Sequence, residues 1–255
     1  MKVIIPMAGR GSRFQPLATK DPRFSYKPFI PVLGSPMISW AVRSLNFVPL
    51  SDFIFIVLKD HEDQFQVTST LRRLFSPAIK TVIIPDITRG AAESALQAGS
   101  AIEDANEDVV ISDSDHFFDG EPLHQTILTK DEDTAGIIPV DLPVDDEIKH
   151  SYTLSRDDKT AVRIAEKDPE LAAQGAYSNI GAYYFSSWSM FSDLIIDALA
   201  NNQVSGPEGK KEFYMAPLYQ KLLDQNKKIQ IAVTKMAYRL GTPADLDYFN
   251  AHYQP

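Results

Sequence analysis

Residue types that bind phosphate gather near the N-terminus. The segment 6–14 (PMAGRGSRF) places Gly9 and Gly11 beside Arg10 and Arg13. Glycine lacks Cβ, so its backbone N–H group can approach phosphate oxygens closely, and arginine adds charged donors in a fork. The spacing is neither a Walker loop nor a dinucleotide fingerprint, because no Gly-Lys-Ser/Thr and no third glycine follow. On this spacing alone, the segment is an ordinary glycine-rich turn with two solvated arginines.

Other charged residues change that interpretation. Lys27 stands between Tyr26 and Pro28, and the proline restricts the backbone on both sides of its peptide bond. Asp113 and Asp115 are two residues apart, so on an extended chain both carboxylates face one side. Carboxylates and phosphate oxygens together form a typical Mg²⁺ site. A surface lysine and ordinary strand-end aspartates are the alternatives, but the full set favours phosphate and metal binding.

Elements that could position these residues alternate along the first half of the chain. We predict strands over 2–6, 53–58, 81–84 and 108–112, and helices over 36–47, 61–75 and 91–103. Continuous Val/Ile runs indicate strands covered on both faces, and the alternation predicts a parallel, doubly wound sheet. Ligands of such sheets bind at the carboxyl ends of the strands. The loops after Pro6 and Ile84 and the acidic stretch after Ser112 should therefore meet.

The pattern changes after residue 134. Strand-like segments at 134–140, 152–154, 161–165 and 177–185 have few helices between them, and 156–160 is typical of a hairpin turn. Helices are predicted again over 187–200, 213–224 and 244–252, and 203–211 is predicted to be a polar loop. We expect a single domain, 1–255, with a nucleotide-binding lobe (1–133) and an acceptor-binding lobe (134–255).

Bulk properties exclude several classes of protein. The formal net charge of −9 argues against a nucleic-acid partner, which calls for a basic face. The chain has no cysteine, which excludes disulfides, thiol nucleophiles and Cys-based zinc sites. The N-terminus does not resemble a secretory signal, and no apolar run approaches the roughly 20 residues of a membrane helix. We expect a soluble cytoplasmic protein without a membrane partner; the sequence does not distinguish a monomer from a homodimer.

The N-terminal motifs, taken in order, resemble a known signature. MAGRGSRF, then YKPFIPV and GSPMISW, is similar to the GxGxR(F/L)…PKP pattern of the sugar-phosphate nucleotidyltransferases. Tyr26 replaces the first proline of PKP, and Ser12 replaces a common threonine. The resemblance implies a Rossmann-like α/β fold of the GT-A type, three-layered α/β/α with a mixed, mainly parallel central sheet. It also implies Mg²⁺ as cofactor and, as substrates, a nucleoside triphosphate and a phosphorylated small molecule.

The resemblance assigns roles on the nucleotide side. Arg13 would contact the β- and γ-phosphates, Lys27 would stabilise charge at the α-phosphate, and Asp115 would bind the metal, with Asp113 and His116 behind it. The implied nucleotide contacts are Ala8, Gly9, Gly11, Ser12, Arg13, Lys27, Thr88, Gly90, Ala91 and Ser114. The family's second metal ligand falls at Arg239, so the number of metal ions stays open, and Arg239 would instead pair with a phosphate. No glutamine stands near 85–87 to read the base, which also stays open.

The resemblance extends to the acceptor side. Glu166 and Lys167 match the family's EKP, so Glu166 would bind sugar hydroxyls and Lys167 the acceptor phosphate. Asn179 and Gly181 match its N-x-G motif, whereas Ser151 stands at a usual glycine and would narrow or repolarise the acceptor pocket. The implied catalytic residues are Arg13, Lys27, Asp115 and Lys167.

The implied reaction transfers a nucleoside monophosphate to a sugar 1-phosphate, releases pyrophosphate and forms a nucleoside-diphosphate sugar for surface polysaccharide synthesis. One alternative is CTP-dependent transfer to a non-sugar phosphate such as phosphocholine. A second is a metal-dependent glycosyltransferase of the GT-A type, because Asp113-Ser114-Asp115 is a DxD motif. A third is a non-catalytic nucleotide sensor. Arg13, Lys27 and Lys167 suit a triphosphate and a phosphorylated acceptor better than a nucleoside-diphosphate sugar donor.

Overall fold

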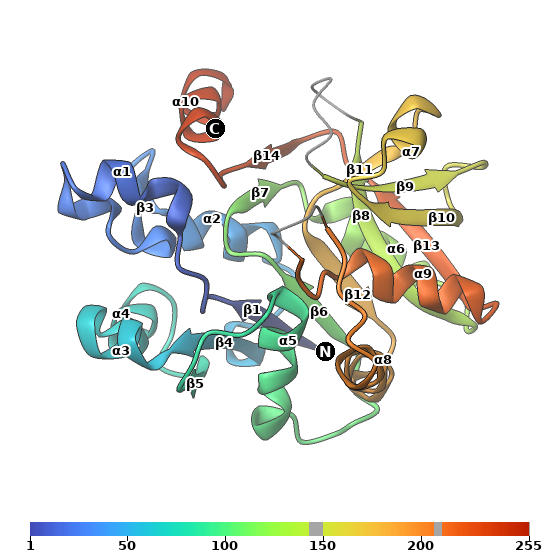
Figure 1. Cartoon of the computed structure of the whole chain (residues 1–255), viewed down its shortest axis with the longest axis horizontal. Coiled ribbons are helices and arrows are strands. Elements are labelled where there is room, and N and C mark those ends of the chain that lie inside the picture. The colour runs from blue at the N-terminus through green and yellow to red at the C-terminus, as the bar shows by residue number, and fades with distance from the viewer. Residues whose placement is uncertain (143–149, 207–210, 255) are drawn as a thin grey trace.

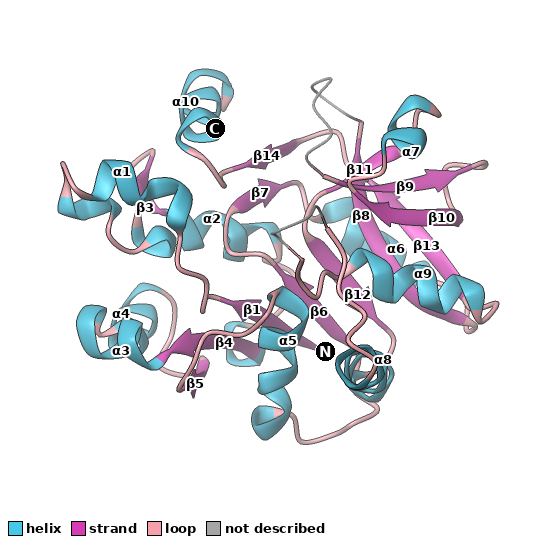
Figure 2. Ribbon diagram, in the orientation of Figure 1, coloured by secondary structure: helices cyan, strands magenta, loops and turns pink. Residues whose placement is uncertain are grey.

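A ten-stranded mixed sheet runs through the molecule, with helices on both of its faces (Figures 1 and 2). The computed structural model describes residues 1–142, 150–206 and 211–254, so part of the predicted polar loop 203–211 lies outside the described residues. The strand order is β10-β9-β11-β8-β12-β6-β1-β4-β5, and β13 pairs with β8. This arrangement confirms the predicted three-layer, Rossmann-like α/β fold.

The two halves of the sheet differ in strand direction. Strands β1, β4, β5 and β6 pair in parallel, as the continuous apolar runs predict, whereas β12, β11, β9 and β10 pair antiparallel with their neighbours. The strands are β1 Lys2–Pro6, β4 Phe53–Leu58, β5 Lys80–Ile84, β6 Val109–Ser112, β8 Thr134–Asp141, β9 Ser151–Ser155, β10 Ala161–Glu166, β11 Tyr177–Asn179, β12 Ala182–Phe185 and β13 Lys228–Val233; two short pairs are β2 Pro31–Val32 with β3 Ser35–Pro36, and β7 His116–Phe118 with β14 Ala237–Arg239.

Alternate residues of the central strand face opposite layers. Val3 and Ile5 pack in the core beneath α2, α4 and α6, whereas Ile4 packs in the core beneath α5, α8 and α9. Burial on both faces explains why β1 has a continuous apolar sequence. The helices are α1 Gln15–Ala18, α2 Met37–Ser44, α3 Lys59–Phe65, α4 Val67–Leu74, α5 Ala91–Leu96, α6 Glu121–Thr129, α7 Pro169–Ala173, α8 Trp188–Ala200, α9 Ala216–Asp224 and α10 Pro243–His252. No helix among the described residues is long and apolar enough to cross a membrane.

Several predicted elements are interrupted. The predicted helix 61–75 is two helices, because Gln66 adopts a left-handed conformation with φ of 50°. The predicted strand 177–185 bends between β11 and β12, where Gly181 has φ of 99°. The strands β7, β13 and β14 and the helices α6 and α7 were not predicted. The short β7 and β14 depend on pairing with each other across the fold, which no local pattern reveals.

The C-terminal segment returns to the N-terminal half. Strand β14 pairs with β7, directly after the aspartates that follow β6. Helix α10 then packs against α2, where Phe249 makes an edge contact with Trp40 at 4.9 Å between ring centroids. This packing places the loop between β14 and α10 beside the carboxyl end of the parallel strands (Figure 1).

Candidate active site

The glycine-rich loop lies directly against Lys27. After β1, Ala8 is buried and Gly9 is exposed, with open space where a Cβ would stand. Gly11 has φ of 61°, and a Cβ on it would lie 3.0 Å from the Cβ of Lys27. Only glycine combines this left-handed backbone with such a close approach. Ser12 and Arg13 follow in an exposed 3₁₀ turn, so their side chains are accessible to a ligand.

Aromatic packing holds Lys27 in place. Its neighbour Tyr26 is buried and stacks on Phe65 at 5.0 Å with an interplanar angle of 11°. The substitution of Tyr26 for the family's first proline therefore replaces backbone restriction by side-chain anchoring. The Lys27 ammonium group forms an ion pair with the Asp115 carboxylate and lies 5.9 Å from the Phe14 ring centroid. Lys27 is thus held beside the glycine-rich loop by the packing of its neighbour Tyr26 and by its ion pair with Asp115.

The two aspartates differ in their electrostatic surroundings. Burial and the nearby charge of Asp115 raise the pKa of Asp113. Burial also opposes ionisation of Asp115, but the charge and hydrogen bond of Lys27 outweigh it and lower the pKa of Asp115. The Asp113 N–H group donates to the Gly181 carbonyl at 2.8 Å. A Cβ on Gly181 would lie 2.6 Å from Asp113 Oδ2, so this glycine is required for the carboxyl group to sit there.

This pair of carboxyl groups suits a hard divalent cation. Lys27 compensates the negative charge of Asp113 only in part, because burial and the charge of Asp115 outweigh it and raise the pKa of Asp113 to about 8. His116 Nδ1 is buried beside the same glycine, 3.2 Å from the Cβ position of Gly181. No group of three or more Asp, Glu or His side chains that could hold a metal occurs within the described residues. Two carboxylates completed by phosphate oxygens and water match the preference of Mg²⁺.

The loop before α5 is clamped by the segment that leads into α9. Gly90 has φ of 147°, and a Cβ there would lie 2.7 Å from the backbone of Phe213. The Phe213 N–H group donates to the Arg89 carbonyl at 2.9 Å, and the Ala92 N–H group donates to the Phe213 carbonyl at 3.2 Å. The Thr88 hydroxyl donates to the Gly90 carbonyl. Helix α5, which begins at Ala91, contacts β1, the strand that leads into the glycine-rich loop.

Glu166 and Lys167 form an ion pair at the end of β10. Lys167 has φ of 52°, its ammonium group lies 3.4 Å from Glu166 Oε1, and the same group stands 4.9 Å from the Tyr214 ring centroid. Burial raises the pKa of Glu166, which acts electrostatically on Asp113. The Glu166–Lys167 pair therefore lies close enough to Asp113 for their charges to interact.

Buried polar side chains on β9, β11 and β12 contact one another. Ser151 Oγ lies 3.3 Å from the Tyr183 hydroxyl, and the Thr153 hydroxyl donates to Asn179 Oδ1 at 2.6 Å. Ser151 thus fills space that a glycine would leave open. Ser114 is half-buried between the two aspartates.

Arg239 cannot serve as a second metal ligand. It stands opposite His116 in the β7–β14 pair, and its guanidinium group donates to the hydroxyl of Ser178 on β11. A guanidinium group is a cation without an acceptor, so it cannot coordinate a metal ion. Its guanidinium group instead brings a permanent positive charge that acts electrostatically on His116 and Asp141.

Gly241 and Asp245 lie beside the site but were not among the predicted site residues. A Cβ on Gly241 would lie 3.0 Å from Asp115 Oδ2, 3.5 Å from an Arg13 terminal nitrogen and 3.7 Å from Asp245 Oδ2. Gly241 therefore lies against both the proposed metal ligand Asp115 and the proposed triphosphate contact Arg13. The only sequence signal was the Gly-Thr pair, and its neighbours become evident only once β14 pairs with β7.

Comparisons with known proteins identify the family of the chain. Residues 2–237 match the family model described as nucleotidyl transferase, and the chain belongs to that family of enzymes. No curated protein sequence matches the chain.

Solved structures share the fold at low sequence identity. A nucleoside-diphosphate-sugar pyrophosphorylase from Vibrio cholerae superposes with a TM-score of 0.77 at 19% identity, over 98% of this chain and 100% of that one. An inositol-1-phosphate CTP transferase from T. maritima superposes with a TM-score of 0.73 at 16% identity, over 96% and 90% of the two chains. A putative glucose-1-phosphate thymidylyltransferase from Bacillus anthracis gives 0.73 at 20% identity, over 98% and 94%.

Proposed function

We propose that this nucleotidyltransferase moves a nucleoside monophosphate group from a nucleoside triphosphate to a sugar 1-phosphate and releases pyrophosphate. The observation that carries the proposal is the Lys27–Asp115 ion pair beside the glycine-rich loop, together with the Glu166 carboxyl group, which is close enough to act electrostatically on Asp113. Several cations near a pair of carboxyl groups suit a reaction between two phosphorylated substrates. The product is a nucleoside-diphosphate sugar, and the form of the motifs supports a role in surface polysaccharide synthesis.

The reaction is an in-line displacement at the α-phosphorus. A phosphate oxygen of the acceptor forms a new bond to that phosphorus, and the bond to the bridging oxygen of the β-phosphate breaks. The attacking oxygen is already an anion at neutral pH, so no general base is required. Lys27 stabilises charge at the α-phosphate, and Arg13 binds the β- and γ-phosphates. Catalysis is then positioning and charge neutralisation.

The carboxyl groups of Asp115 and Asp113 would hold Mg²⁺, which supplies positive charge to the triphosphate oxygens when bound. The chain itself contributes the rest of the nucleotide contacts. Gly9 and Gly11 present backbone N–H groups, and Gly90 and Ala91 begin the helix whose N-terminal end favours an anion or a polar ribose group. On this proposal residues 1–133 form the nucleotide-binding lobe of a single domain.

The acceptor lies on residues of the second lobe, 134–255. Lys167 binds its phosphate, Glu166 accepts hydrogen bonds from its hydroxyls, and Asn179 and Gly181 form the floor beside Ser151. The similarity to an inositol-1-phosphate CTP transferase favours one second candidate, transfer from CTP to a non-sugar phosphate. Phosphocholine and inositol 1-phosphate represent that class.

Pyrophosphate release measured over a matrix of substrates tests the proposal. The matrix combines the four ribonucleoside triphosphates and dTTP with glucose, mannose and amino-sugar 1-phosphates, inositol 1-phosphate and phosphocholine, with Mg²⁺ present. We expect acceptor-dependent pyrophosphate release from one triphosphate with a sugar 1-phosphate. Turnover with only phosphocholine or inositol 1-phosphate would establish the second candidate. Release of a nucleoside diphosphate from a nucleoside-diphosphate sugar would indicate a glycosyltransferase, and no turnover with any pair would contradict the proposal.

A further inference from the structure

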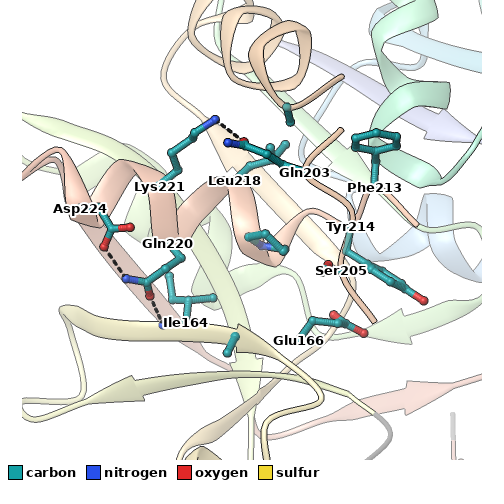
Figure 3. Close-up of a pocket in the computed structure, with 13 residues that line it drawn as sticks. Ile164, Glu166, Gln203, Ser205, Phe213, Tyr214, Leu218, Gln220, Lys221 and Asp224 are labelled. Carbon is teal, nitrogen blue, oxygen red and sulfur yellow. Dashed lines mark hydrogen bonds between the residues drawn. The ribbon is translucent and has the colours of Figure 1, made fainter. Parts of the chain in front are cut away.

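Two consecutive residues, Phe213 and Tyr214, contact both halves of the candidate active site. They lie in the loop that leads into α9, where Phe213 is 2% exposed and Tyr214 is half-buried. Both line the cavity shown in Figure 3, where their side chains point away from each other and Tyr214 is directed toward Glu166. Because consecutive residues have a fixed spacing, a displacement of the Phe213 backbone also moves Tyr214.

The Phe213 backbone is joined to the loop before α5. Its N–H group donates to the Arg89 carbonyl at 2.9 Å, and its carbonyl accepts from the Ala92 N–H group at 3.2 Å. The Arg89 guanidinium carbon lies 4.9 Å from the Phe213 ring centroid. A Cβ on Gly90 would lie 2.7 Å from both the N and the O atom of Phe213, so the two backbones meet without a side chain between them. A shift of either segment therefore displaces the other.

The Tyr214 side chain contacts the lysine of the acceptor side. The Lys167 ammonium group donates to the Tyr214 hydroxyl at 3.4 Å and lies 4.9 Å from the ring centroid. The same ammonium group lies 3.4 Å from Glu166 Oε1. A lysine carries its charge on a flexible stem, so these two neighbours restrict where the charge can lie.

Elements outside the site support this pair of residues. On one side of it, the N–H groups of Ser205 and Glu212 each donate to the other residue's carbonyl at 3.0 Å. On the other side, Met215 and Ala216 are buried where α9 begins. The Phe213 ring itself packs in the main hydrophobic core. A side chain whose supports are packed in this way holds a site more precisely than one on a free loop.

We infer that Phe213 and Tyr214 are positioning residues, which hold the Gly90 loop and Lys167 at a fixed separation. In the proposed function, this separation determines where the nucleotide lies relative to the attacking phosphate of the acceptor. An error of about 1 Å at such a point can reduce the rate about a hundredfold. The inference rests on the proposed function and adds to it a link between the two substrate halves.

Gly90→Ala tests this link. Its Cβ requires the Phe213 backbone to move by about 0.7 Å, because ordinary contact begins at 3.4 Å. With the substrate pair that the matrix identifies, and at saturating triphosphate, we expect the acceptor KM to rise about tenfold, although Gly90 does not touch the acceptor. Gly9→Ala is the matched control: its Cβ meets nothing within 4 Å, so it should raise the triphosphate KM and leave the acceptor KM unchanged. A wild-type acceptor KM in Gly90→Ala would overturn the inference.

A double-mutant cycle shows whether the effect passes through Tyr214. Tyr214→Leu alone should raise the acceptor KM about three- to tenfold. In that background, Gly90→Ala should raise the acceptor KM less than about twofold further, because the contact with Lys167 is already lost. If the two effects multiply in full, Gly90 acts on the acceptor by another route and the inference is wrong.

Arg89→Ala provides a test that does not depend on the folding of Gly90→Ala. It removes an exposed guanidinium group from the Phe213 ring and should raise the acceptor KM about two- to fivefold. Arg72→Ala, an exposed arginine on α4, is its control and should leave the acceptor KM unchanged. Equal acceptor KM values for these two variants would contradict the inference and leave the proposed function intact. No pyrophosphate release by the wild type with any substrate pair would contradict the proposed function instead.

Discussion

Replacing Gly181 by alanine should displace the Asp113 carboxyl group. The new Cβ would lie 2.6 Å from Asp113 Oδ2, and ordinary contact begins at 3.4 Å, so the oxygen must move by about 0.8 Å. A misplacement of about 1 Å at an active site can reduce the rate about a hundredfold. The left-handed φ of 99° adds a strain of about 1–2 kcal/mol for alanine. We therefore expect kcat/KM to fall about a hundredfold and the melting temperature to fall by a few degrees.

Gly175 offers a matched control for this experiment. Its φ is 74°, but a Cβ on it would contact nothing within 4 Å. Gly175→Ala should thus show the strain without the displacement, with a similar fall in melting temperature and nearly unchanged kcat/KM. The assay is pyrophosphate release at saturating Mg²⁺ with each variant's thermal melt. Equal activity of the two variants would refute the reasoning that Gly181 makes room for Asp113.

Further substitutions test separate parts of the site. The added Cβ of Gly9→Ala would lie in open space, so the stability of the protein should not change. The KM for the triphosphate should rise tenfold or more, because the Cβ would keep the triphosphate from approaching the backbone. An unchanged KM would show that the triphosphate does not approach Gly9 closely. Because folding raises the pKa of Asp113, ionisation of this group should lower the free energy of unfolding of the metal-free protein as pH rises above 4. In denaturant titrations, the stability of Asp113→Asn should depend less on pH and should exceed that of the wild type near pH 8. Parallel pH profiles of stability for the two proteins would contradict this expectation. Tyr214→Leu removes the ring beside Lys167 and should raise the acceptor KM about three- to tenfold, with Tyr214→Phe close to wild type; equal effects on the triphosphate KM would indicate a general disturbance.

The parallel half of the sheet could be predicted from local pattern. Strands β1 and β4 were predicted with their observed bounds, because burial on both faces requires an unbroken apolar run. The proximity of the glycine-rich loop to Asp115 could be predicted in the same way, because the loop follows β1, Asp115 follows β6, and these two strands are parallel neighbours. Lys27 was predicted from its restrained position between Tyr26 and Pro28.

Features that depend on distant pairing could not be predicted. The bend at Gly181 coincides with a close approach to Asp113, which lies far away in the sequence. Gly241 approaches Asp115 only because β14 pairs with β7, and both strands have three residues, too few for a periodic signal. The apposition of Phe213 and Gly90 likewise joins two loops whose local sequences do not indicate that they meet.

Acceptor-dependent pyrophosphate release by Lys27→Ala tests the central claim most directly. Lys59→Ala is the control, because Lys59 forms an exposed ion pair with Asp63 outside the site. With the substrate pair that the matrix identifies, we expect kcat to fall by a factor of about 10²–10³ or more in Lys27→Ala and to remain unchanged in Lys59→Ala. Wild-type turnover by a folded Lys27→Ala protein would contradict the assignment of the Lys27–Asp115 site as the centre of nucleotidyl transfer.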